Sequence, residues 1–282
     1  MTAFLKMNGL GNDFVVIDAR GDGALPEPEQ IRRIADRRRG VGCDQLIVMQ
    51  AAEPPADVFM RIFNPDGSEA EACGNATRCV ARVVGEETGR TEVAVRTVAG
   101  LLHTTLLDDG RVTVDMGEPR FGWADIPLSE EMGTLNLDIP VGPLDAPELS
   151  DPCAVNMGNP HCIFFVRDVH AHRLEDLGPL LEHHPLFPQR TNVELAQIMA
   201  PGRIRLRVWE RGTGITPACG SGACATAVAA VRRGLTERRV TVDVDGGELT
   251  IEWTPENHVL MTGPIALSFR GEMDPGLLAA AG

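Results

Sequence analysis

The amino-acid sequence predicts an α+β fold in which two copies of one mostly antiparallel domain follow each other along the chain. Two motifs, Ala72–Cys79 and Ala218–Ala225, both begin Ala-Cys-Gly and both lead into a run of small apolar residues. Such a run predicts a buried helix. Most other segments are short, apolar or alternating, and separated by turn residues, which is typical of antiparallel strands.

A nearly constant offset relates the two halves of the chain. Offsets of 146 or 147 residues pair Cys73 with Cys219, 61–64 with 207–210, Asn12 with Asn159, Gln45 with Asn192, and Val112 with Val259. Repetition at a fixed offset indicates an internal duplication. Cys79 and Cys224 match under neither offset, so we expect them to be thiols buried within the two helices.

The first copy shows clear strand and turn signals. The Gly- and Asn-rich stretch 8–13 and the sequence Asn64–Ser68 are predicted turns between strands. In chain order we expect strands at 4–7, 14–18, 46–50, 58–63, 92–97, 101–107 and 111–116, with helices at 28–39 and 76–84.

The second copy follows an irregular connection that contains six prolines between 119 and 152. We expect strands at 162–166, 204–209, 240–244, 248–253 and 259–262, with helices at 174–184 and 223–231, the latter ending near Gly234. The predicted domains are 1–118, completed by 264–282, and 119–263. The Met- and Ala-rich end of the chain gives no structural signal.

Composition limits the class of partner. The net charge of −14 argues against binding to a nucleic-acid backbone or to an anionic membrane surface, so a small-molecule substrate is expected. No apolar run approaches the roughly 20 residues that span a bilayer. The chain has seven cysteines, an odd number, and no charged and apolar leader follows Met1. These features predict a cytoplasmic protein whose cysteines are free thiols and not disulfides.

Two other kinds of site are disfavoured by context. The stretch 220–225 fits the pattern G-x-G-x-x-A of a dinucleotide-binding turn. In that motif the glycines follow the strand directly, whereas about ten residues separate this stretch from the preceding predicted strand. Four histidines at 170, 172, 183 and 184 lack the spacing of a metal site, so we expect surface histidines and no metal.

The matched cysteines predict proton transfer at carbon. Each sulfur is expected at a helix N-terminus, where unpaired backbone N–H groups favour a thiolate and can bind a carboxylate. One thiolate can remove a proton from one face of a carbon while the opposing thiol protonates the other face. N–H groups near Gly74-Asn75 and Gly220-Ser221 could hold an α-carboxylate. This route needs no cofactor. For a lone cysteine, packing at a helix start would be the simpler interpretation.

Four stretches closely resemble the diaminopimelate epimerase family, in the right order and over nearly the whole chain. They are FLKMNGLGNDFVVID at 4–18, FNPDGSEAEACGNATRC at 63–79, MGNPHC at 157–162 and WERGTGITPACGSGACA at 209–225. The resemblance implies two similar domains, each a mostly antiparallel sheet wrapped around a central helix, with the active site between them. It also implies a homodimer that interconverts LL- and meso-diaminopimelate without a cofactor, for lysine and peptidoglycan synthesis.

The resemblance also implies roles for individual residues. Cys73 and Cys219 would be the acid/base pair, with His161 and Glu210 assisting proton transfer. Gly74, Asn75, Gly220 and Ser221 would bind the α-carboxylate. The distal amino-acid end of the substrate would be held by Asn12, Gln45, Asn64, Asn159, Asn192, Glu210 and Arg211. An Arg and amides suit a carboxylate, and Glu210 suits an ammonium group. Taken alone, His161 would be interpreted as a structural histidine.

The chain departs from the usual family pattern at Asn8, Ile215 and Ser221, none of which is expected to contact a cysteine. Two alternatives stay open from the sequence. Proline racemases share the architecture, although they need no distal-end residues such as Glu210 and Arg211. A thiol redox protein would instead join Cys73 to Cys219 in a regulatory disulfide.

Overall fold

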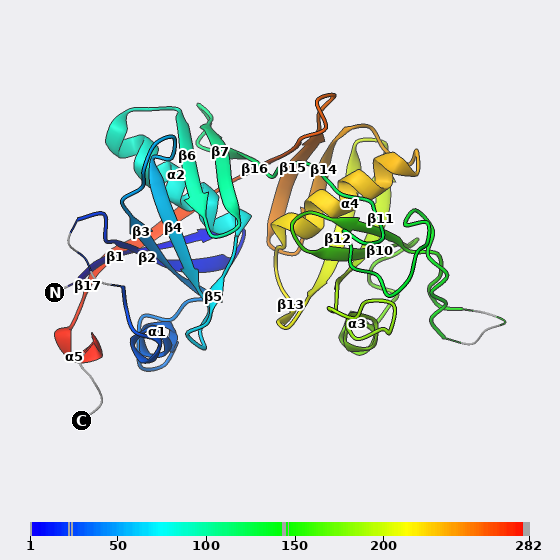
Figure 1. Ribbon diagram of the computed structural model, residues 1–282, viewed down its shortest axis with the longest axis horizontal. Coiled ribbons are helices and arrows are strands. Elements are labelled where there is room, and N and C mark those ends of the chain that lie inside the picture. The colour runs from blue at the N-terminus through cyan, green and yellow to red at the C-terminus, as the bar shows by residue number, and fades with distance from the viewer. Residues whose placement is uncertain (1, 22, 24, 143–144, 146, 279–282) are drawn as a thin grey trace. The chain divides into compact units, whose positions relative to one another are not determined.

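The computed structural model describes residues 2–21, 23, 25–142, 145 and 147–278. The chain divides into two compact units, here called unit 1 (Met1–Val114 with Gly263–Gly282) and unit 2 (Asp115–Thr262). Strands dominate both units, which confirms the predicted α+β class (Figure 1). Pro143 of the proline-rich connection and residues 279–282 of the predicted completing segment lie outside the described residues. No helix within these ranges is long and apolar enough to cross a membrane.

Unit 1 contains one curved, mixed sheet. Its strands are β1 (Thr2–Gly9), β2 (Asn12–Asp18), β3 (Gln45–Gln50), β4 (Val58–Phe63), β5 (Glu69–Ala70), β6 (Glu92–Thr97), β7 (Gly100–Leu106), β8 (Val112–Asp115) and β17 (Ala266–Met273). The pairs β2–β3 and β4–β6 are parallel. The pairs β17–β1, β1–β2, β3–β4, β4–β5, β6–β7 and β7–β8 are antiparallel. The sheet is therefore mostly antiparallel, as predicted.

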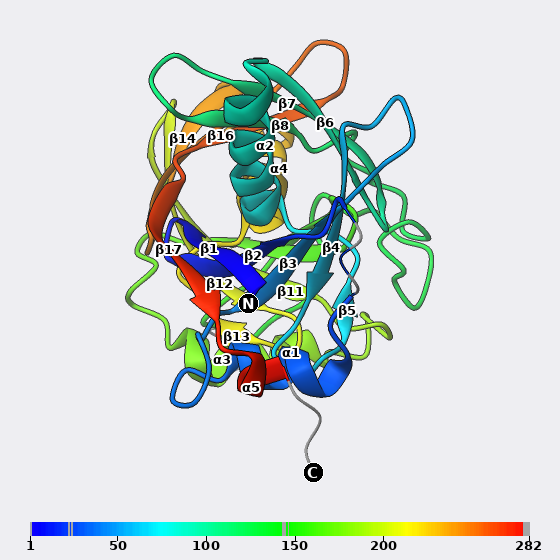
Figure 2. The ribbon, with the colours of Figure 1, turned by 90° about the vertical axis from the view of Figure 1, so that its left-hand side faces the viewer.

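Helices cover both faces of the β2–β3 region, which explains why these strands are continuously apolar. On one face, Phe14 and Ile47 pack in the core around α2 (Gly74–Thr88). On the other, Val15 and Leu46 pack in the core that contains α1 (Pro28–Ala35). Helix α2 contacts β1, β2, β4, β6 and β7, so the sheet curves around it (Figure 1 and Figure 2).

Unit 2 repeats this architecture. Its strands are β9 (Cys153–Asn156), β10 (Pro160–Phe165), β11 (Asn192–Ala200), β12 (Arg203–Glu210), β13 (Gly214–Ile215), β14 (Arg239–Val244), β15 (Gly247–Trp253) and β16 (Val259–Gly263). The pairs β10–β11 and β12–β14 are parallel, and the pairs β9–β10, β11–β12, β12–β13, β14–β15 and β15–β16 are antiparallel. This is the same order as β1 to β8, so the two units are copies of one fold. Helix α4 (Gly220–Arg232) contacts β9 to β12, β14 and β15.

Two predicted helices end earlier than the sequence suggested. Helix α1 ends at Ala35 and not near residue 39, because Asp36 adopts an extended backbone and its carboxylate accepts hydrogen bonds from the N–H groups of Arg38 and Arg39. Helix α3 (Leu174–Glu182) ends two residues before the predicted end at His184. Helix α4 is followed by Gly234 in the left-handed region, as the predicted cap requires.

Three strands of useful length were not predicted. They are β9, β11 and β17. Strand β11 carries polar residues at 192 and 194 that lie on its buried side, so its pattern does not look like a strand with one solvent-facing side. The offset that pairs Gln45 with Asn192 aligns β3 with β11 in the sequence, so it could have predicted a strand there. A short helix, α5 (Pro275–Leu278), follows β17.

Candidate functional site

The two matched cysteines occupy the same position in their units. Cys73 is the N-cap residue of α2 and Cys219 is the N-cap residue of α4, both with extended backbones. The first-turn N–H groups of a helix have no partner within that helix. Each cysteine therefore stands beside a set of backbone donors and the positive end of a helix dipole, which is where a carboxylate binds well.

In unit 1, polar side chains surround the sulfur of Cys73. The Cys73 thiol donates to Asn12 Oδ1 over 3.8 Å, and Asn75 Nδ2 donates to the same oxygen over 3.2 Å. Gly9 lies next to this group, and a Cβ there would come within 3.0 Å of an Arg78 nitrogen and 3.4 Å of Asn75 Cβ. The close packing of the β1–β2 hairpin on α2 thus brings Asn12 to the cysteine.

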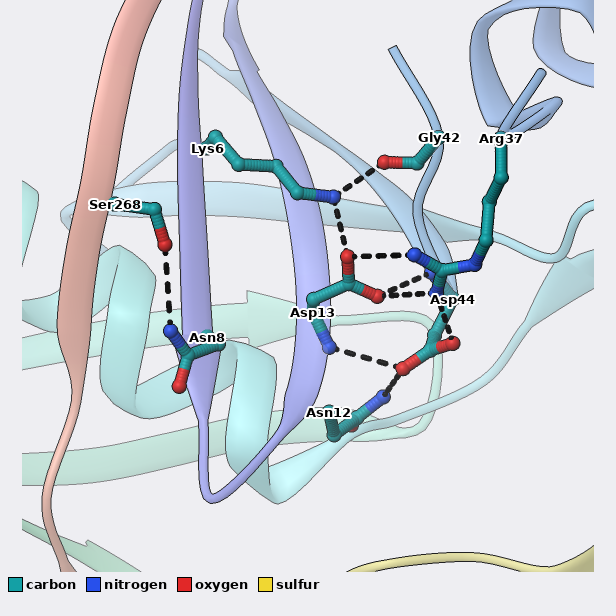
Figure 3. A network of polar contacts seen from close by, with 8 residues as sticks. All are labelled: Lys6, Asn8, Asn12, Asp13, Arg37, Gly42, Asp44 and Ser268. Atoms are coloured by element: carbon teal, nitrogen blue, oxygen red, sulfur yellow. Dashed lines mark hydrogen bonds and ion pairs between the residues drawn. The ribbon is translucent and has the colours of Figure 1, made fainter. Parts of the chain in front are cut away.

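A charged network fixes the position of Asn12 (Figure 3). Asn12 Nδ2 donates to Asp44 over 3.1 Å, and Arg37 forms ion pairs of 2.6 Å with both Asp44 and Asp13. Lys6 completes the network through Asp13 and the carbonyl oxygen of Gly42. Burial alone would raise the pKa of Asp13, but Arg37 and Lys6 outweigh burial and hold that pKa well below its usual range.

Two further predicted residues meet at the ends of neighbouring strands in unit 1. Gln45 is the first residue of β3, and Asn64 follows the last residue of β4. Gln45 Nε2 donates to Asn64 Oδ1 over 3.2 Å. Asn64 Nδ2 in turn donates to Ser68 Oγ over 3.1 Å. Asn64 therefore shapes the turn and also accepts a hydrogen bond from the Gln45 amide.

In unit 2, Cys219 is held at the start of α4. Its Sγ accepts a hydrogen bond of 3.4 Å from the backbone N–H of Gly222 and lies 3.6 Å from Ser221 Oγ. The expectation that none of the three unusual residues contacts a cysteine is thus wrong for Ser221, because the side chain of the second helical residue turns back toward the cap. Asn8 instead donates to Ser268 Oγ over 3.4 Å (Figure 3). Ile215 is 40% exposed.

The surroundings of Cys219 favour the thiol. Burial raises the pKa of this cysteine well above its usual value, and the negative charges of Glu210 and Glu194 add to the effect. The contacts with Ser221 and the Gly222 N–H act in the opposite direction but are weaker. The sequence predicted that the helix N-terminus would favour a thiolate here. That contribution exists, but burial beside two carboxylates outweighs it.

A second buried polar group joins β10 to β11. His161 Nδ1 lies 2.6 Å from Glu194 Oε1, and both side chains are fully buried. On the other side of the ring, Nε2 lies 2.9 Å from Asn159 Oδ1. Burial raises the pKa of Glu194, contact with His161 opposes this, and the charge of Glu210 adds to it.

The remaining predicted residues of unit 2 form a chain of contacts. Asn192 Nδ2 donates to the carbonyl oxygen of Pro160 over 2.8 Å, and Asn192 Oδ1 accepts from the backbone N–H of Arg211 over 2.8 Å. Thr216 Oγ1 donates to Glu210. Asn192 therefore joins the start of β10 to the end of β12, where Glu210 is the last strand residue and Arg211 follows it.

Hydrogen bonds thus join predicted residues to one another within each unit. In unit 1, Asn12 and Asn75 contact each other beside Cys73, which Gly74 follows in the chain, and Gln45 contacts Asn64. Unit 2 brings together Asn159, His161, Asn192, Glu210, Arg211, Cys219, Gly220 and Ser221. Sequence reasoning missed Glu194 and the network of Lys6, Asp13, Arg37 and Asp44. Glu194 could have been found, because it lies two residues from Asn192 and shares its side of the strand.

The chain matches a known family over most of its length. Residues 4–122 and 153–267 match the family model described as diaminopimelate epimerase. A relative from Rhodospirillum centenum with that name is 58% identical over 276 residues, which cover 98% of this chain and 93% of the relative. A second, from Acidiphilium cryptum, is 54% identical and covers 98% of each chain.

One solved structure shows how widely the fold is shared. A probable proline racemase from Agrobacterium radiobacter superposes with a TM-score of 0.67 at 18% identity and covers 100% of this chain and 96% of its own. Identity at that level speaks for the fold alone, so the sequence relatives and the family model decide the assignment. On that evidence the chain belongs to the diaminopimelate epimerase family.

Proposed function

We propose that this protein is a cofactor-independent epimerase that interconverts LL- and meso-2,6-diaminopimelate through Cys73 and Cys219. The observation that carries the proposal is the equivalent placement of the two cysteines, each an N-cap at the start of the central helix of its unit. The names of the curated relatives, which are 50–58% identical, support the choice of substrate.

The proposed reaction moves one proton off and one proton onto the same carbon. The thiolate of one cysteine removes the α-proton, which leaves a thiol and a carbanion conjugated with the α-carboxylate. The thiol of the other cysteine then protonates the opposite face of that carbon and becomes a thiolate. The product is the inverted centre, and the enzyme has exchanged the roles of its sulfurs.

Cys219 is the proposed proton donor in the turnover that starts from the resting enzyme. Burial, together with the charge of Glu210, supports its thiol form. The proposed route requires the two sulfurs to approach the α-carbon from opposite sides. His161 and Glu210 are proposed to assist these proton transfers.

The growing negative charge needs donors that are already oriented. We propose that the backbone N–H groups at Gly74, Asn75, Gly220 and Ser221 bind the α-carboxylate, because charge delocalises onto it as the proton leaves. The distal amino-acid end is assigned to amide, carboxylate and guanidinium groups. They belong to Asn12, Gln45, Asn64, Asn159, Asn192, Glu210 and Arg211.

Turnover in deuterated water tests both the substrate and the route. Purified, reduced protein would be given LL-diaminopimelate, and separately L-proline, with no added cofactor. We expect inversion of diaminopimelate with solvent deuterium at the α-carbon of the product, measured by mass spectrometry and chiral chromatography. Inversion of proline alone would keep the two-base route and overturn the substrate. Absence of turnover with both substrates in folded protein would overturn the function.

We also propose a cytoplasmic homodimer that acts in lysine and peptidoglycan synthesis, as the family resemblance implies. Two large apolar side chains on β17 support a second copy as partner, since Leu267 is 41% and Phe269 is 50% exposed. Sedimentation equilibrium measures this directly. A monomer at micromolar concentration would contradict the dimer.

A further inference from the structure

Glu194 is a buried carboxyl group to which the proposed reaction assigns no role. Its side chain is fully buried on β11 and contacts His161 Nδ1 at 2.6 Å through Oε1. Its other oxygen, Oε2, is also buried and has no hydrogen-bond partner among the described residues. A buried carboxyl group with an unpaired oxygen destabilises the fold, because burial removes the water that would otherwise donate to that oxygen.

Unit 1 shows that the fold does not need this polar pair. An offset of 147 residues places Phe14 on His161 and Ile47 on Glu194, and the strand registers agree, with Phe14 opposite Gln45 and His161 opposite Asn192. Both Phe14 and Ile47 are fully buried in the core around α2. The same place in the same fold is therefore apolar in one copy and polar in the other.

The helix next to the pair has changed with it. The position of Ala76 in α2 corresponds to Gly222 in α4 at the offset of 146 that pairs Cys73 with Cys219. A Cβ at Gly222 would lie 2.9 Å from Glu194 Oε1 and 3.3 Å from Cys219 Sγ. The missing methyl group makes room for the carboxyl group beside the sulfur, so unit 2 is built to hold Glu194 there.

We propose that Glu194 is a positioning residue of the epimerase, which acts through His161 by holding its ring at Nδ1 and keeping one proton in the His161–Glu194 pair beside Cys219. This inference rests on the proposed function. Replacing a buried ion pair by apolar residues is often neutral or stabilising, so the fold gains no clear stability from the pair. Its presence is explained by the proton that it retains.

The retained proton matters when Cys219 gives up its own. As Cys219 Sγ transfers its proton to the α-carbon, it becomes a thiolate beside Glu194. A pair that holds one proton, as imidazolium with carboxylate or as imidazole with carboxylic acid, has no net charge and opposes this new charge only weakly. The carboxylate without that proton would oppose it strongly in a buried site. No bond within the pair breaks in this step.

The ring orientation follows from the same contact. With Nδ1 held by Glu194, the ring presents Nε2 to Asn159, a residue that the proposed function places at the substrate. A histidine anchored at one nitrogen offers the other in a fixed direction. Without Glu194 the ring can turn and its proton is no longer shared.

A double-mutant cycle tests the coupling between the two residues. We expect Glu194→Gln to lower kcat by about 10- to 100-fold with little change in KM, which is less than the roughly 10²- to 10⁴-fold loss expected when an acid/base group itself is removed. In the His161→Asn background, the same change should cost little further activity. Unchanged kcat in Glu194→Gln, or the same factor lost in both backgrounds, would overturn the proposal.

Two further variants separate positioning from folding. Glu194→Ile introduces the residue that unit 1 carries at the matching place, so it is expected to fold and still to lose kcat, which keeps the test valid if Glu194→Gln is unstable. Thr226→Val is the matched control on α4, because Thr226 is fully buried and its hydroxyl has no hydrogen-bond partner among the described residues. It should leave kcat unchanged. Full activity in Glu194→Ile would contradict the proposal.

A spectroscopic measurement tests the pair without turnover. In protein labelled with ¹⁵N-histidine, the signals of His161, assigned by their loss in His161→Asn, should show a strongly hydrogen-bonded Nδ1 proton that disappears in Glu194→Gln. If the wild-type protein shows this signal but does not epimerise diaminopimelate, the proposed function fails while the pairing stands. Identical His161 spectra in wild type and Glu194→Gln would overturn the pairing itself.

Discussion

At the scale of single residues, the two matched cysteines share a backbone position but differ in their surroundings. Cys73 is half-buried and contacts the amide of Asn12, whereas Cys219 is only 5% exposed and lies near two carboxylates. A thiol near negative charge holds its proton more tightly. The duplicated fold thus gives the two sulfurs the same N-cap position and different surroundings, and the surroundings of Cys219 favour its thiol.

Removal of either sulfur should stop the reaction. We expect Cys73→Ala and Cys219→Ala each to lower kcat/KM by at least about 10²- to 10⁴-fold, because each variant lacks one of the two proton routes. Chiral chromatography of the product measures the rate, and circular dichroism measures folding. Substantial epimerisation by either variant would contradict the two-base route.

Cys79 provides the matched control in the same helix as Cys73. It is fully buried within α2, and burial raises the pKa of its thiol to about 12. It therefore stays protonated at neutral pH and takes no part in proton transfer. Cys79→Ala should lose some stability through a small cavity and retain the wild-type rate.

At the scale of secondary-structure elements, one charged network ties the β1–β2 hairpin to the segment between α1 and β3. Lys6 lies on β1, Asp13 on β2, Arg37 after α1 and Asp44 before β3. Asp44 also accepts hydrogen bonds from the side chain of Asn12 and the backbone N–H of Asp13. The network therefore fixes the position of the hairpin turn relative to α2, and with it the position of Asn12.

Asp13→Asn should destabilise unit 1 markedly at neutral pH. The change leaves the charge of Lys6, which is only 11% exposed, without its carboxylate, and loss of one partner of a buried pair costs about 3 kcal/mol. The folded-state pKa of Asp13 is lowered, so its contribution is fully present above about pH 4 and is lost progressively as the pH falls from there toward the lowered pKa. Urea unfolding at pH 7 and pH 3 measures both effects.

The control lies on the same strand. Asp18 pairs with Arg20 over 2.6 Å, but its side chain is 49% exposed. Asp18→Asn should therefore cost at most about 1 kcal/mol at neutral pH. An equal loss in the two variants, or a loss in Asp13→Asn that does not shrink at low pH, would argue against the network.

At the scale of the whole molecule, buried thiols make stability sensitive to alkali. Burial raises the pKa of Cys43 to about 11 and of Cys79 to about 12, and it also raises the pKa values of Cys153, Cys162 and Cys219. Few other groups titrate in that range, because the chain has no Tyr and a single Lys, Lys6.

The urea midpoint should fall as the pH rises above about 8.5 under reducing conditions. Between the unfolded and the folded pKa of a thiol, the folded state binds more protons, so stability present below the unfolded pKa is lost as the pH rises. Each such thiol contributes a slope of about 1.4 kcal/mol per pH unit. A midpoint that stays constant from pH 8 to pH 10.5 would contradict the raised values. Cys43→Ala should show a shallower decline than wild type.

The sequence by itself determined the class of fold, its repetition and the helix starts that carry Cys73 and Cys219. It could do so because turn residues, apolar periodicity and a repeated motif are local signals, and two copies repeat each signal. The offset between the two copies also indicated the position of β11, although the polar residues of this strand obscured its pattern. Resemblance to a family then supplied the remaining candidate residues.

Only the tertiary structure decided which of these residues lie together and in what electrostatic setting. Glu194 lay in no predicted strand and in no predicted site, and the pairing of β10 with β11 places it against His161, with Gly222 leaving space beside Cys219. The acidity of Cys219 likewise depends on burial and on Glu210 and Glu194, which lie on other secondary-structure elements. Burial and the distance between charges arise from the packing of side chains from different elements, so a short stretch of sequence does not predict them.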